Sequence, residues 1–234
     1  MVATGQTTKF ASVVPTEIID VLNPTKSCVL DDKIIDHYQY GGRGGMFGTT
    51  PVICGGTNGT DYCLLYGTPQ KIMLSTFRIH HSSVGLNNSM LWIMGGYGAI
   101  GDGYGVVGST EFVTREGAVN GPTLPEPSAW HCSVLFPGNG NVYLIGVGAV
   151  GGGNKVLVAN PSNGFTFAQG PKLRTARSQH ACGTMSIGTK NIIVVAGGIS
   201  HNNRPLIPGT VEILDPLTNQ WVAGTTYFYM YYIT

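Results

Sequence analysis

The chain has 234 residues, 35 of them glycine, with a formal net charge of +1 and only 11% charged residues. A hydrophobic content of 42% allows a sizeable core and, with the low net charge, excludes intrinsic disorder. Lysine and arginine are scattered, which excludes a nucleic-acid partner, and the absence of a run of eighteen apolar residues excludes a membrane span. Many glycines among valine, isoleucine and tyrosine predict an all-β fold of short strands and tight turns.

Three sequence features recur along the chain with a period near fifty residues. The histidines are His81, His131 and His180, spaced 50 and 49 residues apart. Apolar runs that end in glycine lie at 51–56, 90–96, 142–146 and 192–198. Strand-like segments that contain glutamate lie around Glu17, Glu111 and Glu212. Each unit therefore predicts four short strands, with its glutamate expected to pair between neighbouring units.

The last unit carries the pattern most fully, from His180 through Gly197-Gly198 to Glu212 and Trp221. This order resembles the kelch repeat. The resemblance implies an all-β, kelch-type β-propeller with one four-stranded blade per repeat. The sequence also resembles secreted invertebrate kelch-type proteins, and the implied fold is that of the central domain of galactose oxidase.

The repeats predict about four and a half four-stranded blades. The rear of one blade is expected at 1–35, whole blades at 36–75, 76–124, 125–171 and 172–224, and an irregular tail at 225–234. The unit 36–75 is degenerate, with Tyr40-Gly41-Gly42 where a histidine is expected. Closed propellers have about four to eight blades. The chain is therefore interpreted either as a fragment with an incomplete ring, which we favour, or as a small ring closed by the N-terminal strands.

One cysteine pair has a geometric argument for a disulfide. Cys54 and Cys63 flank Asn58-Gly59, the preferred pair for a two-residue type I′ turn. That turn sets the two cysteines opposite each other in a non-hydrogen-bonded pair with Cα atoms about 4.5 Å apart, within reach of a disulfide. Two ordinary buried thiols are the alternative. Five cysteines in all leave at least one free or paired with another chain.

Two N-glycosylation sequons begin at Asn58 and Asn87. Together with the cysteine pair they favour a secreted or extracellular protein, and a cytoplasmic location is the alternative.

No metal site and no cofactor are expected. The three repeated histidines would lie around a ring, whereas zinc needs ligands about 2 Å from one centre. We expect them to bond to backbone groups instead. Gly96 to Gly101 matches the spacing of a dinucleotide-binding loop, but no helix can follow it, so residues 97–108 are interpreted as a long flexible inter-strand loop.

Arg78 and Arg177 each precede a repeated histidine by three residues. The resemblance implies that arginines near this strand line the mouth of the central channel and bind acidic groups through bidentate hydrogen bonds. The alternative is that each arginine bridges neighbouring blades.

The resemblance further implies that binding occurs on loops at one face of the propeller. The loops expected there are 57–60, 97–108, 147–153, 199–209, 121–127 and 169–176. The two longest carry the other candidate binding residues, which are Tyr97, Asp102, Tyr104, His201, Asn202, Asn203 and Arg204.

The predicted function is a non-enzymatic kelch-repeat scaffold that binds a protein partner, which the sequence does not identify. No paired carboxylates for acid–base catalysis are evident, and the copper ligands of galactose oxidase have no counterpart here. Two alternatives are a carbohydrate- or sialic-acid-active enzyme of the same superfamily and a non-functional gene fragment.

Overall fold

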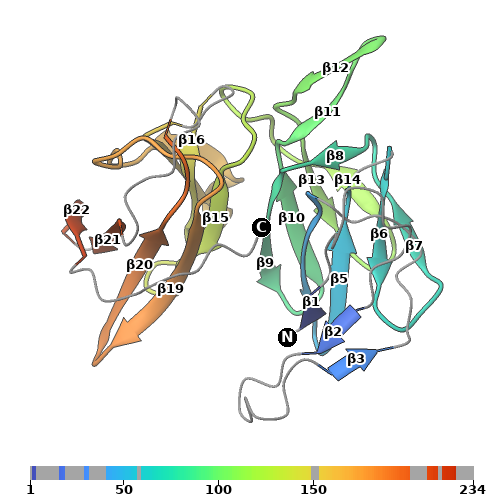
Figure 1. The fold of residues 1–234 in the computed structure, drawn as a ribbon, viewed down its shortest axis with the longest axis horizontal. Coiled ribbons are helices and arrows are strands. Elements are labelled where there is room, and N and C mark those ends of the chain that lie inside the picture. The colour runs from blue at the N-terminus through green and yellow to red at the C-terminus, as the bar shows by residue number, and fades with distance from the viewer. Residues whose placement is uncertain are drawn as a thin grey trace.

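The computed structural model describes residues 2–3, 16–18, 29–31, 41–56, 59–148, 153–200, 210–215 and 218–224. Apart from the 3-10 turn η2 (Pro161–Asn163), these residues form strands, turns and irregular segments. All paired strands among them are antiparallel (Figure 1).

Four four-stranded sheets follow one another along the chain, and we number them blades I to IV. Blade I contains β4 (Arg43–Phe47), β5 (Thr50–Cys54), β6 (Tyr62–Leu65) and β7 (Lys71–Met73). Blade II contains β9 (Ser82–Asn87), β10 (Met90–Met94), β13 (Thr110–Val113) and β14 (Ala118–Asn120). Blade III contains β15 (Cys132–Leu135), β16 (Val142–Val147), β17 (Lys155–Asn160) and β18 (Thr166–Gln169). Blade IV contains β19 (Ala181–Ile187), β20 (Lys190–Ala196), β21 (Val211–Asp215) and β22 (Gln220–Ala223).

A further sheet precedes the blades, with three short strands, β1 (Val2–Ala3), β2 (Thr16–Ile18) and β3 (Val29–Asp31). The four blades lie within the expected ranges 36–75, 76–124, 125–171 and 172–224. This repeated arrangement of sheets confirms the all-β propeller that the sequence predicts.

The first strands of the blades contact each other in chain order, β4 with β9, β9 with β15, and β15 with β19. Three apolar clusters fill the spaces between successive blades because strands buried on both faces present apolar side chains to both neighbours. Phe47 of blade I packs in one cluster with Leu91 of blade II. Trp92 of blade II lies in the second cluster with Leu144 of blade III, and Ile145 packs with Ile193 of blade IV in the third. Each blade is therefore stabilised mainly by its neighbours.

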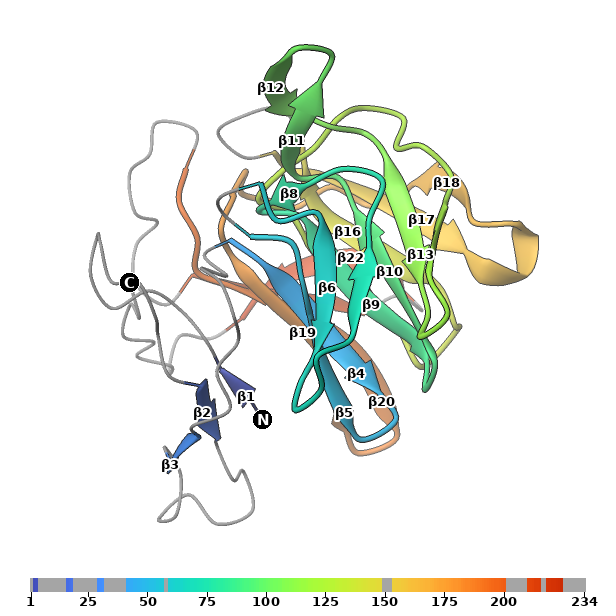
Figure 2. The same ribbon diagram turned by 90° about the vertical axis from the view of Figure 1, so that its right-hand side faces the viewer.

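The segment 97–108 differs from the flexible loop expected there. It forms a β-hairpin of β11 (Tyr97–Ile100) and β12 (Gly103–Val106), and β11 pairs with β8 (Arg78–Ile79). Figures 1 and 2 show the hairpin standing out from the blades at one end of the molecule. The two strands do carry larger side chains at alternate positions, because Tyr97 lies opposite Val106 and Ala99 lies opposite Tyr104. Glycine on the other face hides this pattern in the sequence.

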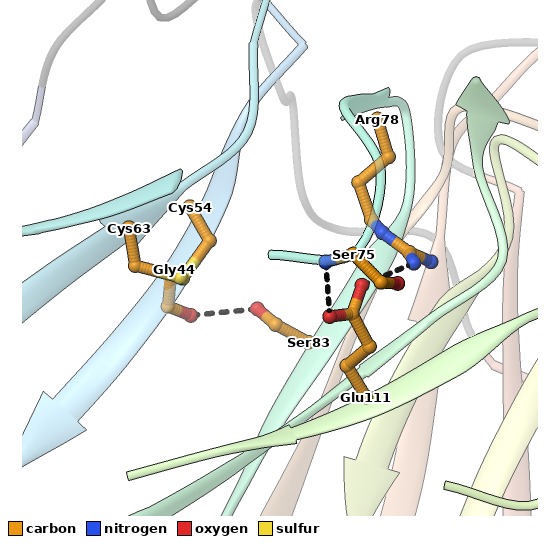
Figure 3. The surroundings of a disulfide bond; sticks show 7 residues. All are labelled: Gly44, Cys54, Cys63, Ser75, Arg78, Ser83 and Glu111. Carbon is orange, nitrogen blue, oxygen red and sulfur yellow. Dashed lines mark hydrogen bonds and ion pairs between the residues drawn. A yellow bond between two sulfur atoms is a disulfide. The ribbon is translucent and has the colours of Figure 1, made fainter. Parts of the chain in front are cut away.

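The disulfide between Cys54 and Cys63 is confirmed, and Figure 3 shows it between β5 and β6. The two residues are register partners with Cα atoms 3.9 Å apart, closer than expected. A second disulfide that sequence reasoning missed joins Cys132 on β15 to Cys182 on β19, with Cα atoms 6.0 Å apart. It links neighbouring blades. The fifth cysteine, Cys28, lies outside the described residues.

Candidate functional site

A buried arginine–glutamate pair recurs in blades II and IV. In blade II, Arg78 Nη2 donates to Glu111 Oε1 at 2.6 Å, and Glu111 Oε2 accepts the Ser75 backbone N–H at 2.8 Å (Figure 3). In blade IV, Arg177 Nη2 donates to Glu212 Oε1 at 2.7 Å. Each pair joins the strand entry of a blade to the third strand of that same blade. The repeated glutamates therefore bind the arginine of their own blade, and Glu111 also binds Ser75 at the end of the preceding unit.

The expectation that these arginines bind an external acidic group is corrected. The side chains of Arg78 and Arg177 are 0% exposed. Nη1 of each arginine donates to backbone carbonyl oxygens, including Gly95 O at 2.9 Å from Arg78 and Gly197 O at 2.8 Å from Arg177. A buried guanidinium needs a countercharge and several acceptors, and the chain supplies both internally.

The repeated histidines are buried side chains that pack against the preceding blade. A Cβ at Gly55 would lie 2.9 Å from His81 Cε1, and one at Gly95 would lie 3.0 Å from His131 Cε1. Both glycines also have left-handed backbone, with φ of +63° and +62°. A side chain there is therefore disfavoured both by the close contact and by the backbone conformation. In blades I to III, the glycine that ends the apolar run therefore makes room for the histidine of the next blade.

The expected bond to a backbone group is found for His180, whose ring interacts with the backbone of Ile145, but not for the other two histidines. His131 Nε2 lies 2.8 Å from Ser82 Oγ of blade II, and His81 makes no hydrogen bond through either ring nitrogen. Burial is the main cause that lowers the pKa of His131 to about 4 and that of His180 to about 3. These rings are therefore neutral at pH 7. The Ser82–His131 pair has almost no exposed surface and serves as a contact between blades.

The residue directly before each histidine position forms a hydrogen-bonded chain that crosses all four blades. The N–H of His80 donates to Gly41 O at 2.7 Å, that of Trp130 to His80 O at 2.9 Å, and that of Gln179 to Trp130 O at 3.0 Å. All four residues have left-handed backbone, with φ between +54° and +74°. We call this set the inter-blade chain. It lies at the entry to the first strands β4, β9, β15 and β19.

Aromatic side chains gather on the inter-blade chain beside the hairpin. The rings of His80 and Trp130 stack with centroids 5.0 Å apart, and Tyr97 lies 6.4 Å from Trp130. Further along β12, Tyr104 packs edge-on against Phe77 with centroids 5.4 Å apart. Most of these rings are half-buried, so part of each faces solvent. We call these five residues the aromatic strip.

Arg43 lies next to the aromatic strip, because it begins β4 two residues after Gly41, whose carbonyl binds the His80 N–H. Its side chain is exposed and donates to Gly42 O at 3.1 Å. Arg43 has no carboxylate partner within the described part of the chain. Burial and the Arg43 charge together lower the pKa of His80 to about 4.

The tip of the β11–β12 hairpin is strongly exposed. The exposed fractions are 53% for Ile100 and 72% for Tyr104, and Asp102 occupies the exposed turn between the strands. Of the candidate binding residues, Tyr97, Asp102 and Tyr104 thus share one hairpin.

The remaining expected site residues are Asn87 and a group that the structure does not describe. His201, Asn202, Asn203 and Arg204, and the sequon at Asn58, lie outside the described residues. Asn87 is exposed at the β9–β10 turn, where its Oδ1 accepts the Ser89 N–H at 2.8 Å.

Among the described residues, no three His, Cys, Asp or Glu side chains are grouped to hold a metal ion. In the same part of the chain we find no helix with the length and apolar character needed to cross a membrane.

Sequence reasoning missed Arg43, Trp130 and Gln179. The available signal was position, since each sits beside the repeated histidine position, but only the folded blades bring the positions together.

Comparison with known proteins supports the propeller fold. No family model matches the chain, and no curated protein matches it. The chain is similar to the solved structure of YjhT, with 16% sequence identity and a TM-score of 0.63 over 80% of this chain. The match spans 66% of the length of YjhT. At this identity the likeness shows the fold alone, and the chain is a β-propeller.

Proposed function

We propose that the chain is a non-enzymatic scaffold that binds another protein through the β11–β12 hairpin and the surface at its foot. The observation that carries this proposal is the exposure of Ile100 and Tyr104 on a hairpin that stands out from the blades (Figure 1). Exposed large apolar and aromatic side chains are common anchors of protein interfaces. A hairpin whose strands are already paired also has less conformational entropy to lose on binding than an unstructured loop.

We also propose that the chain is a kelch-repeat protein and that it acts outside the cell. The repeated histidines, terminal glycines and Arg–Glu pairs support the first part. The two disulfides, one of them between blades, support the second, because disulfides persist mainly in oxidising compartments. The exposed sequon at Asn87 is available for glycosylation there.

The test is affinity capture from extracellular fluid of the source organism with the immobilised chain. The test variant carries Ile100→Asp and Tyr104→Ala. The matched control is Val222→Asp on β22, a side chain that is 50% exposed but far along the chain from the hairpin. We expect the wild type and the control to retain the same stoichiometric partner and the hairpin variant to lose it. Equal capture by all three proteins, or no discrete partner with any of them, would refute the proposal.

A further inference from the structure

The strand β12 has one paired edge and one open edge. It lies at the end of its sheet, and within the described residues it pairs only with β11. The Val107 N–H donates to Gly96 O at 2.9 Å. Because bonded and non-bonded pairs alternate along an antiparallel ladder, Gly105 directs its backbone groups to β11. The backbone N–H and C=O groups of Tyr104 and Val106 therefore point to the open side.

The open edge of β12 lacks the features that usually protect an edge strand. Lysine, proline or a bulge commonly blocks such an edge, as Lys71 can on the outer strand β7. The sequence of β12 contains neither residue, and its register with β11 shows no shift. Among the described residues, the one contact with these outward groups is that of the Tyr97 hydroxyl, 3.5 Å from Tyr104 O, which is long for a hydrogen bond. The edge is therefore a template for one further strand.

The side chains around this edge define which strand would fit. A Cβ at Gly105 would lie 2.8 Å from Ile100 Cδ1, so the exposed Ile100 side chain covers the glycine face of the hairpin. A residue directly opposite Gly105 on an added strand would project from this same face, beside Ile100. A large apolar side chain there would bury Ile100 without meeting a side chain from Gly105. Asp102, the one charged residue in the sequence 97–106, favours a basic residue at the turn end.

We propose that β12 binds an extended segment of the partner as an additional antiparallel strand. The segment carries a large apolar residue opposite Gly105 and a basic residue opposite Asp102. Its backbone bonds to Tyr104 and Val106 supply affinity, and its alternate side chains supply specificity. The antiparallel direction continues that of β8, β11 and β12. This inference rests on the proposed protein-binding function and names the conformation and chemistry of the segment that binds.

The experiment uses a peptide whose backbone bonds can be removed on one edge at a time. Fluorescein-Ser-Thr-Val-Phe-Val-Thr-Lys-NH2 is titrated with the full chain while fluorescence anisotropy is recorded. With phenylalanine opposite Gly105, the valine N–H groups face β12 and the threonine N–H groups face away. We expect saturable binding that weakens at least tenfold when both valines are N-methylated. N-methylation of both threonines adds the same two methyl groups and is expected to change the affinity less than twofold.

A matched pair of proline variants tests the same edge from the side of the protein. Val106→Pro removes an outward N–H from β12 and is expected to weaken binding of the unmethylated peptide at least tenfold. The control is Asn120→Pro on the edge strand β14. The Asn120 N–H also points away from its sheet, because the Gly121 N–H donates to Thr110 O at 2.8 Å. This control is expected to bind the peptide as the wild type does.

Three results would overturn the proposal: equal binding of the two methylated peptides, no saturation with the unmethylated peptide, or full binding by Val106→Pro. A dimer of the chain that Val106→Pro dissociates in sedimentation velocity would assign the edge to a second copy and would also overturn it. Any of these results together with hairpin-dependent capture of a partner would refute this inference and leave the proposed function standing.

Discussion

Removing the carboxylate of Glu111 tests the buried ion pair of blade II. Glu111 is 1% exposed and accepts from Arg78 at 2.6 Å and from the Ser75 N–H at 2.8 Å. Glu111→Ala leaves a fully buried guanidinium without its countercharge, which costs about 3–5 kcal/mol. Typical total stabilities are about 5–15 kcal/mol, so the loss is a large share. At roughly 2–4 °C per kcal/mol for a chain of this size, the melting temperature falls by roughly 10 °C.

The assay is urea unfolding of wild type, Glu111→Ala and a matched control, Glu126→Ala. Glu126 also pairs with a cation at 2.6 Å, but that pair is partly exposed, so its removal costs less than about 1 kcal/mol. The double variant Arg78→Met with Glu111→Leu is expected to be more stable than Glu111→Ala, since it leaves no buried charge. Equal destabilisation by Glu111→Ala and Glu126→Ala would show that burial of the pair is not what makes it matter.

Three further predictions concern strain, pH and the disulfides. Gln179→Gly relieves left-handed strain and raises the free energy of unfolding by about 1 kcal/mol in urea titrations, and a loss of stability would contradict the strain argument. His131 and His180 are buried as neutral rings, so protonation favours the unfolded chain: stability is complete above about pH 6.5 and falls as the pH drops toward 4, by about 3 kcal/mol for His131. His131→Asn should flatten that decline in unfolding curves measured from pH 7 to pH 4.5, and an unchanged slope would count against it. Removing the disulfide that closes 50 residues, by Cys132→Ser with Cys182→Ser, is expected to cost about 4 kcal/mol against about 3 for the disulfide that closes nine, and calorimetry of both variants would reveal a reversed order.

The features that depend on local sequence could be predicted. The propeller follows from apolar runs and turns that repeat every fifty residues, and the disulfide between Cys54 and Cys63 follows from the Asn58-Gly59 turn. Both need only the geometry of one chain segment. The blade repeat also predicts that residues one period apart have equivalent positions.

The features that depend on packing between segments could not be predicted. Cys132 and Cys182 are one repeat apart, but their pairing needs the first strands of blades III and IV to lie side by side. The burial of Arg78 needs Glu111, 33 residues later, to come under it. The sequence places both residues but does not show that both are buried.

Hydrogen–deuterium exchange on the complex with the captured partner tests the central claim most directly. The claim is that binding occurs at the hairpin end of the propeller. We expect the partner to protect the amides of β8, β11, β12 and the segment 128–131. Protection of the outer strands β7, β14 and β22, with the hairpin unchanged, would contradict the account.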